Sequence, residues 1–402
     1  MISGLAGAPP TTAGTPSLLK AINERSVLDC IQRQGPMSRA DVAREGGLSK
    51  PTVSLALSGL LEAGLVREVG RSHGGRGPSA LLYELNPQAG WVVGIDVGRR
   101  WVRAAIADIA GTIVARREER ARVASASSLI GQIGAIAHDL AREAGLGWPQ
   151  VTHAAIGSPG VFDRSRGLIR MAPNLPGWGR QGLVEAVRKV LGTNVTFEND
   201  VNLAALGEQA HGHGRGVRDF VYLSVGTGIG MGLIVDGRLY TGSTGAAGEI
   251  GYLPLGGDGR SAHRRWGALE EAAAAAGMVR TARDLGMRPP LTALKVFNAA
   301  RRGEPTARKA IAVEAERLAL AIATVTPILD PELVVLGGGI GRNGDLLLDG
   351  IERELRRWSP FHPRVMTSAL GDDGVLQGAV ATALQAARER VFSRSPARAM
   401  EA

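Results

Sequence analysis

The stretch that decides the fold is Val221 to Pro254, which reads VYLSVGTGIGMGLIVDGRLYTGSTGAAGEIGYLP. It predicts a strand, a glycine turn, a second strand and a glycine-rich loop that ends in a single carboxylate, Glu249. In the turn Gly226–Gly230, glycines permit positive φ and leave no Cβ, so the backbone can pass close to a phosphate or a sugar. A GxGxG pattern is equally typical of a plain hairpin. Other motifs along the chain must decide between the two.

The composition is that of a globular protein with more than one domain. A chain of 402 residues is expected to form two or three domains, and 44% hydrophobic with 21% charged residues is ordinary for a soluble protein. No apolar run approaches the ~20 residues that span a bilayer. The segment before Lys20 lacks the pattern of a secretory signal. A single cysteine, Cys30, excludes an internal disulfide and a cysteine-cluster metal site, so we expect a cytoplasmic protein.

The net charge of +9 and the pI of about 10.3 permit a polyanionic partner. The excess is not concentrated at the N-terminus, since residues 1–90 hold nine Lys or Arg and seven Asp or Glu. Charge therefore only supports a nucleic-acid partner that other features must establish.

The N-terminal part has the order of elements of a winged helix-turn-helix. Residues 18–34 carry a helical stripe of apolar side chains. Ser38 then caps a short helix, and Ser49 caps a second one, with a proline in its first turn. Two strands are expected at residues 65–69 and 80–85, joined by a loop rich in glycine and arginine.

The second helix of this motif presents short polar groups and one cation to the major groove, namely Ser49, Lys50, Thr52 and Ser54. In the wing loop, Arg71 and Arg76 stand among glycines, which suits insertion into a narrow minor groove. We therefore expect operator DNA as a partner. The alternative is a small helical protein-interaction domain in which the glycines only form a hairpin turn.

Strands alternate with helices in the rest of the chain, which predicts an α/β body. The expected strands are residues 91–98, 102–108, 151–157 and 333–336, and the expected helices are residues 128–144 and 203–210. Glycine turns follow several strands, and the acidic turn Asn199-Asp200 opens a helix. Turns of this kind commonly surround a ligand.

Five motifs occur in the order of the ROK family: GIDVG (94–98), APNLPGW (172–178), ENDVNLAALGE (198–208), VGTGIGMGLIVDGRLYTGSTGAAGEIG (225–251) and VVLGGGI (334–340). The similarity covers about residues 91–390. With the winged helix in front, the chain resembles the xylose-repressor and N-acetylglucosamine-repressor branch of that family. The resemblance implies an actin-like, hexokinase-type α/β fold of two lobes. We expect a disordered tail at 1–16, the winged helix-turn-helix at 17–85, the ROK body at 86–390 and a second tail at 391–402.

The resemblance also implies the residues that meet sugar hydroxyls, which are Asn174, Asn199, Asp200, Glu249 and Glu270. Carboxylates and amides suit this task because hydroxyls both donate and accept hydrogen bonds. In the family's kinases, the residue matching Asp200 is the general base. The structural alternative for Asn199-Asp200 is a helix N-cap, and the two roles are compatible.

The sequence departs from the family's kinases in three ways. The slim phosphate turn is replaced by Gly98-Arg99-Arg100-Trp101, whose side chains are expected to obstruct phosphate. The family's zinc ligands, one His and three Cys, are replaced by Tyr252, Ser261, His263 and Ala268, so we expect no metal and no cofactor. Tyr252 also replaces a histidine that orients the sugar. The kinase-like Asp96, Gly226–Gly230 and Gly337–Gly341 are then interpreted as parts of the fold inherited without ATP binding.

The sequence thus predicts a sugar-responsive transcriptional regulator and not an enzyme. We expect this regulator to be a repressor of carbohydrate genes. A homodimer is expected because two identical heads read a palindromic site. The alternative is an ATP-dependent sugar kinase that carries a DNA-binding head. A third reading is a regulator that responds to a partner protein or to a phosphosugar held by Arg99 and Arg100.

Overall fold

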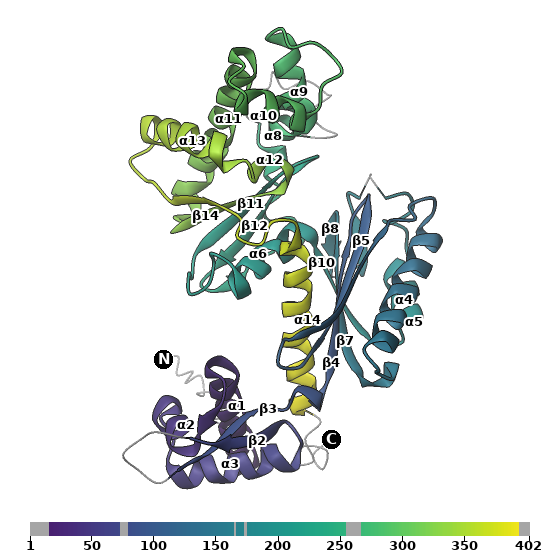
Figure 1. Cartoon of the computed structure of the whole chain (residues 1–402), viewed down its shortest axis with the longest axis vertical. Coiled ribbons are helices and arrows are strands. Elements are labelled where there is room, and N and C mark those ends of the chain that lie inside the picture. The colour runs from purple at the N-terminus through teal and green to yellow at the C-terminus, as the bar shows by residue number, and fades with distance from the viewer. Residues whose placement is uncertain (1–15, 73–78, 165, 173–174, 255–266, 394–402) are drawn as a thin grey trace, which may run out of the picture. The chain divides into compact units, whose positions relative to one another are not determined.

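The computed structural model describes residues 16–72, 79–164, 166–172, 175–254 and 267–393. The chain forms two compact units. The head unit comprises residues 1–91, 108–112 and 386–402, and the body unit comprises residues 92–107 and 113–385. Their elements are labelled in Figure 1.

The head unit is a winged helix-turn-helix, as the sequence predicts. Its elements are α1 (Pro16–Gln34), β1 (Met37–Ser38), α2 (Arg39–Gly46), α3 (Lys50–Glu62), β2 (Val66–Arg71) and β3 (Leu81–Leu85). The strands form an antiparallel sheet in the order β1-β3-β2. The three helices bury apolar side chains such as Ile31, Val53 and Leu57 against Tyr83 of β3. Burial of this apolar area is the main stabilising contribution.

Local hydrogen bonds fix where the helices of the head begin. The hydroxyl of Ser38 accepts from the backbone N–H of Asp41 at 3.2 Å, and the Asp41 carboxylate accepts from the backbone N–H of Ser38 at 3.3 Å. This reciprocal capping box starts α2. Ser49 caps α3 by accepting from the N–H of Thr52 at 3.3 Å. Both predicted caps are confirmed.

Two later segments of the chain also belong to the head unit. One is the turn at residues 108–112, between β5 (Trp101–Asp108) and β6 (Ile113–Arg120). The other is the end of α14 (Gly374–Ser393), where Val391 packs against the head core. Arg388 donates from Nε and Nη2 to the carbonyl oxygen of Ile109, at 3.1 and 2.8 Å, and so joins the two segments. Helix α14 continues three residues beyond residue 390, at which the sequence analysis ends the body.

The first lobe of the body unit is built on a five-stranded sheet in the order β10-β7-β4-β5-β6. In addition to β5 and β6, it contains β4 (Trp91–Val97), β7 (Val151–Ser158) and β10 (Asn194–Asn199). Helices α4 (Ala126–Glu143) and α5 (Leu183–Leu191) lie along one side of this sheet, and α14 lies along the other (Figure 1). A short hairpin, β8 (Val161–Asp163) and β9 (Leu168–Arg170), and the 3-10 turns η1 (Pro87–Ala89) and η2 (Trp148–Gln150) complete the first half of the chain.

The second lobe has a five-stranded sheet in the order β13-β12-β11-β14-β15. The strands are β11 (Phe220–Val225), β12 (Ile229–Val235), β13 (Arg238–Leu239), β14 (Leu333–Gly337) and β15 (Arg364–Thr367). Its helices are α8 (Ala268–Ala273), α9 (Ala275–Asp284), α10 (Ala293–Arg301), α11 (Pro305–Leu329), α12 (Gly338–Gly341) and α13 (Gly344–Trp358), with 3-10 turns η3 (Ile250–Tyr252) and η4 (Gly371–Asp373). Helix α6 (Asp200–His211) packs on the other face of the sheet through Ala204 and Ala205. The two-lobed α/β body is confirmed.

The glycine turn between β11 and β12 corrects one sequence argument. None of Gly226, Gly228 and Gly230 has a positive φ, so conformational freedom is not the reason for these glycines. The lack of a Cβ is the reason, because a Cβ on Gly228 would lie 2.8 Å from Oε2 of Glu270. Positive φ occurs in the following loop instead, for example 89° at Gly248.

Among the helices that the structure describes, none combines the length and the apolar character needed to cross a lipid bilayer.

We predict that Ser38→Ala destabilises the head unit by about 1 kcal/mol, because it removes the acceptor of the α2 capping box. Hydrogen exchange of the α2 and α3 amides in the full-length chain would measure the change. Ser58→Ala is the control, since Ser58 is exposed in the middle of α3 and its hydroxyl only donates to the carbonyl of Ser54. Equal protection in the two variants would show that the cap contributes nothing.

Candidate functional site

Three carboxylates predicted from the sequence come from three different elements of the body. Asp200 is the first residue of α6, directly after β10. Glu249 is the N-cap of η3, and Glu270 lies in the first turn of α8. Burial raises the pKa of Glu249, and the negative charges of Asp200 and Glu270 raise it further. Glu249 therefore lies within electrostatic range of both other carboxylates.

The three carboxylates have no cationic partner in the described part of the chain. No lysine, arginine or histidine of that part forms an ion pair with Asp200, Glu249 or Glu270, and burial raises the pKa of each. Asp200 accepts from the backbone N–H of Val201, at 2.9 Å. Partly buried acceptors of this kind are costly unless donors reach them. The cluster therefore suits a ligand rich in neutral donors.

Glu270 is held against the glycine turn. Its Oε2 accepts from the backbone N–H of Ile229 at 3.0 Å, and the missing side chain of Gly228 makes room for it. Tyr252, which is 41% exposed, lies near the same carboxylates. Burial raises the pKa of its hydroxyl, and the charges of Glu249 and Glu270 raise it further. Its phenol is thus protonated at neutral pH and can donate a hydrogen bond.

Asn199 has the structural role that the sequence left open. It is the N-cap of α6, where its Oδ1 accepts from the N–H groups of Val201 and Asn202 at 2.8 and 3.2 Å. Its Nδ2 donates to the carbonyl of Gly160 at 3.0 Å. The N-cap role is confirmed, and contact with a ligand stays a prediction.

Asp96 of β4 is a buried carboxylate that faces a cation. Burial raises its pKa to about 6, the charge of Arg103 opposes this shift, and the charge of Asp200 adds to it. Nη1 of Arg103 donates to Oδ2 of Asp96 at 3.1 Å, and Nε of Arg103 pairs with Glu118 of β6. The sequence analysis missed Arg103. The available signal was a single charged residue within the apolar strand 102–107.

The turn at Gly98-Arg99-Arg100-Trp101 contains a backbone hydrogen bond between its first and last residues. The N–H of Gly98 donates to the carbonyl of Trp101 at 2.9 Å, so this donor is already used. Arg99 and Arg100 are exposed. The guanidinium of Arg120, from the neighbouring strand, lies 5.0 Å from the centre of the Trp101 ring, which is a cation–π contact.

Some predicted positions lie outside the described residues, namely Asn174, Arg76, Ser261 and His263. Within the described residues, no group of three or more His, Cys, Asp or Glu side chains is arranged to hold a metal ion.

The candidate DNA-binding face of the head is the start of α3. Lys50 is its first residue and is exposed, while the hydroxyls of Ser49 and Thr52 lie 2.7 Å apart. Ser54 is half-buried one turn later, and Arg71 ends β2 in an exposed position. The sequence analysis missed Leu55, which is 63% exposed on α3 and falls off the apolar stripe. Such a side chain fits the methyl group of a thymine.

Residues 92–386 match the family model described as ROK family. The chain belongs to the ROK family. In front of this ROK body, residues 21–77 match the model described as MarR family. Both expectations from the sequence, the family and the winged-helix head, are confirmed.

The relatives of the ROK chain include both regulators and kinases. A xylose repressor from Caldicellulosiruptor bescii is 28% identical over 391 residues, which are 92% of this chain and 96% of the repressor. A glucokinase from Halalkalibacterium halodurans is 32% identical over 312 residues, which are 72% of this chain and 93% of the kinase. The kinase thus matches the ROK body, whereas the repressor also matches the head.

The solved structures that are similar to this chain also include a regulator and a kinase. A ROK family transcriptional regulator, described as a homologue of the E. coli MLC protein, covers 94% of this chain and 99% of its own with a TM-score of 0.80. At 23% identity it supports the fold alone. A ROK family glucokinase from Streptomyces griseus in complex with glucose and AMPPNP is 28% identical, covers 74% of this chain and 100% of its own, and has a TM-score of 0.63.

We predict that the stability of the ROK body depends on the protonation of Asp96. Folding raises this pKa from 3.8 to about 6, so the folded body favours the protonated form. The stabilising contribution of the group is complete below pH 3.8 and is lost as the pH rises through 6. Relative to Asp96→Asn, the wild type should lose up to about 3 kcal/mol of unfolding free energy between pH 4 and pH 7.

Melting temperatures of the two proteins over that pH range would measure the loss. Asp373→Asn is the control, because Arg116 holds the pKa of Asp373 below its usual range. The contribution of Asp373 is lost only as the pH falls, so its difference from the wild type should stay flat above pH 5. A constant difference for Asp96→Asn as well would mean that Arg103 keeps Asp96 charged throughout.

Proposed function

We propose that this ROK protein is a transcriptional repressor that binds operator DNA through α3 and the β2–β3 wing and releases it in response to a sugar. The sugar binds at Asp200, Glu249 and Glu270, with Tyr252, Asn199 and Asn174 as further contacts. The observation that carries the proposal is a cluster of carboxylates that have no cationic partner among the described residues, in the same chain as a winged helix.

A neutral polyol fits these carboxylates better than an anion does. Each sugar hydroxyl donates a hydrogen bond, and adjacent hydroxyls match the two oxygens of a carboxylate. The charges of Asp200 and Glu270 already raise the pKa of Glu249, and carboxylates so placed would also repel a phosphate group. This favours a free sugar over a phosphosugar, for which the exposed Arg99 and Arg100, shortly after Asp96 in the sequence, would be the cations.

The relatives support repression and suggest the sugars to test. Two xylose-repressor relatives match 92% of the chain, a share that includes both the head and the body. Glucokinases match the body alone. D-xylose and D-glucose are therefore the first two probes. We further propose a homodimer in the cytoplasm, because two identical heads read the two halves of a palindromic operator.

A sugar kinase with a DNA-binding head is the rival function. In its favour, burial raises the pKa of Asp200, as a general base requires. Against it, Asp96 is neutralised by Arg103 and the N–H of Gly98 is bonded to Trp101. A guanidinium beside Asp96 competes with any metal ion that would bring a nucleotide phosphate to this carboxylate. We propose that the chain has no kinase activity.

We predict that Lys50→Ala weakens DNA binding and lowers the salt dependence by roughly one phosphate contact. The loss follows from the exposed position of Lys50 at the start of α3. Gel-shift titrations at several salt concentrations, with a duplex selected from a random library by the wild-type protein, would measure it. Lys309→Ala, an exposed lysine on α11, is the control. If both variants bind as the wild type does, Lys50 lies outside the DNA interface.

We predict that Asp200→Asn lowers sugar affinity by about 1–3 kcal/mol, because it removes charge and replaces a pure acceptor. Calorimetric titration with D-xylose and D-glucose would measure this, with the exposed Asp284→Asn as control. Neither protein should phosphorylate either sugar. ATP-dependent turnover above ~1 per second in the wild type, lost in Asp200→Asn, would establish the kinase instead.

A further inference from the structure

Helix α14 is one continuous helix that takes part in both units. Its residues 374–385 belong to the body and its remaining residues belong to the head. In the body, Val380 packs so closely on β4 that a Cβ on Gly94 would lie 2.7 Å from the N of Val380. In the head, Val391 joins the apolar core and Arg388 holds the turn at Ile109. Any change at the first half of α14 therefore acts on an element of the head core.

The first half of α14 is in direct backbone contact with the helix that begins at Asp200. Gly207 of α6 faces Gly374 and Gly378 of α14, and a Cβ on Gly207 would collide with the carbonyl of Gly374. A Cβ on Gly378 would collide with the carbonyl of Leu203. With no side chains between the backbones, α6 has no room to move against α14. A displacement of α6 must move α14 as well.

A buried carboxylate makes a second connection between α6 and α14. Glu208 of α6 is fully buried, and its Oε1 accepts from the hydroxyl of Ser368 at 2.6 Å and from the N–H of Leu370 at 3.2 Å. Ser368 in turn accepts from the N–H of Gly371 at 3.0 Å. The loop that leads into α14 is thus hydrogen-bonded to the same helix that carries Asp200.

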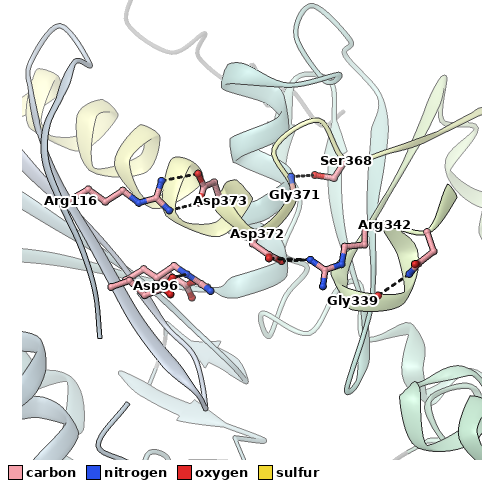
Figure 2. Close-up of polar contacts among 11 residues, drawn as sticks. Asp96, Arg116, Gly339, Arg342, Ser368, Gly371, Asp372 and Asp373 are labelled. Atoms are coloured by element: carbon pink, nitrogen blue, oxygen red, sulfur yellow. Dashed lines mark hydrogen bonds and ion pairs between the residues drawn. The ribbon is translucent and has the colours of Figure 1, made fainter. Parts of the chain in front are cut away.

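Two ion pairs converge on the residues just before α14, as Figure 2 shows. Arg116 of β6, in the first lobe, donates to Asp373 at 2.8 Å. Arg342, directly after α12 of the second lobe, donates to both carboxylate oxygens of Asp372, at 3.0 and 3.2 Å. Adjacent residues thus bind opposite lobes. A change in the angle between the lobes pulls on this junction from both sides.

We propose that α14 carries the occupancy of the sugar site from the body to the head, and that the Glu208–Ser368 hydrogen bond is a necessary link in this route. The inference rests on the proposed function and adds the path by which sugar binding in the body reaches the head. A sugar that engages Asp200 at the start of α6 displaces α6. The glycine crossing and the Ser368 loop pass the displacement to α14, whose last turns belong to the head core.

The contacts along α6, the Ser368 loop and α14 can be compared with the coupling that regulation needs. Coupling between two ligands typically changes affinity by a factor of 5–150. The ion pairs of Asp372 and Asp373 are exposed, and such pairs contribute little individually. Glu208 itself is fully buried, and its Oε1 accepts from both Ser368 and Leu370, which makes these contacts the stronger link. Ser368 is therefore the residue whose removal should weaken the coupling most without touching the sugar site.

The experiment compares full-length wild type with Ser368→Ala. For each protein, the Kd for the selected duplex is measured without and with saturating D-xylose or D-glucose, and the Kd for the sugar is measured without DNA. We expect the sugar to weaken DNA binding of the wild type at least fivefold. In Ser368→Ala this ratio should fall to below twofold, while the sugar Kd of the DNA-free protein stays within threefold of the wild-type value.

Ser359→Ala is the matched control, because Ser359 also accepts a backbone N–H, from Phe361 at 3.0 Å, in an exposed loop after α13. It should keep the wild-type ratio. Hydrogen exchange gives a second readout: sugar should change the exchange of residues 386–391 in the wild type and not in Ser368→Ala. A wild-type ratio in Ser368→Ala, or sugar-insensitive exchange at residues 386–391 of the wild type, would overturn the route. A wild type whose DNA binding ignores both sugars would overturn the proposed function itself.

Discussion

The backbone contact between α6 and α14 is the constraint on which the rest of the body depends. Glycines at 207 and 378 are required because a Cβ on either would collide with the backbone of the opposite helix. This contact fixes α6 against the helix that lies along the first sheet. Since α6 also packs on β11 and β12, the same helix relates the two lobes. Larger residues at these two positions would separate α6 from α14, and the positions of Asp200 and Glu208 would change with them.

A second feature of the body is that its buried carboxylates differ in the groups that bind them. Asp96 and Glu208 are buried with partners supplied by the protein, a guanidinium for one and hydroxyl and amide donors for the other. Asp200, Glu249 and Glu270 have raised pKa values and no ion pair within the described residues. A raised pKa does not by itself separate the two groups, since burial raises the pKa of Asp96 as well. The difference lies in the donors: side chains bind Asp96 and Glu208, whereas Asp200 and Glu270 accept from backbone N–H groups and can still accept from a ligand.

Much of this organisation could be predicted from the sequence because its signals are local. The caps at Ser38 and Ser49 and the strand-to-turn patterns depend on neighbouring residues, and the model confirms them. Positive φ was the wrong reason for the glycines at 226, 228 and 230, whereas the missing Cβ is the right reason at Gly228, whose decisive neighbour, Glu270, is distant in sequence. Arg103 and Leu55 were missed for a related reason. The role of Arg103 depends on partners from other strands, Asp96 and Glu118. Leu55 is notable only because the fold leaves it exposed.

The composition of the head unit has a consequence for how the protein matures. Its core combines the first part of the chain with the turn at residues 108–112 and with Val391. During synthesis, the whole body unit therefore emerges from the ribosome before Val391, the last side chain of the head core. A nascent chain that has emerged only as far as β3 lacks the contacts of Arg388 and Val391. We therefore expect a fragment that ends at β3 to have a less stable head than the full-length chain, because it lacks the last apolar contact of the head core.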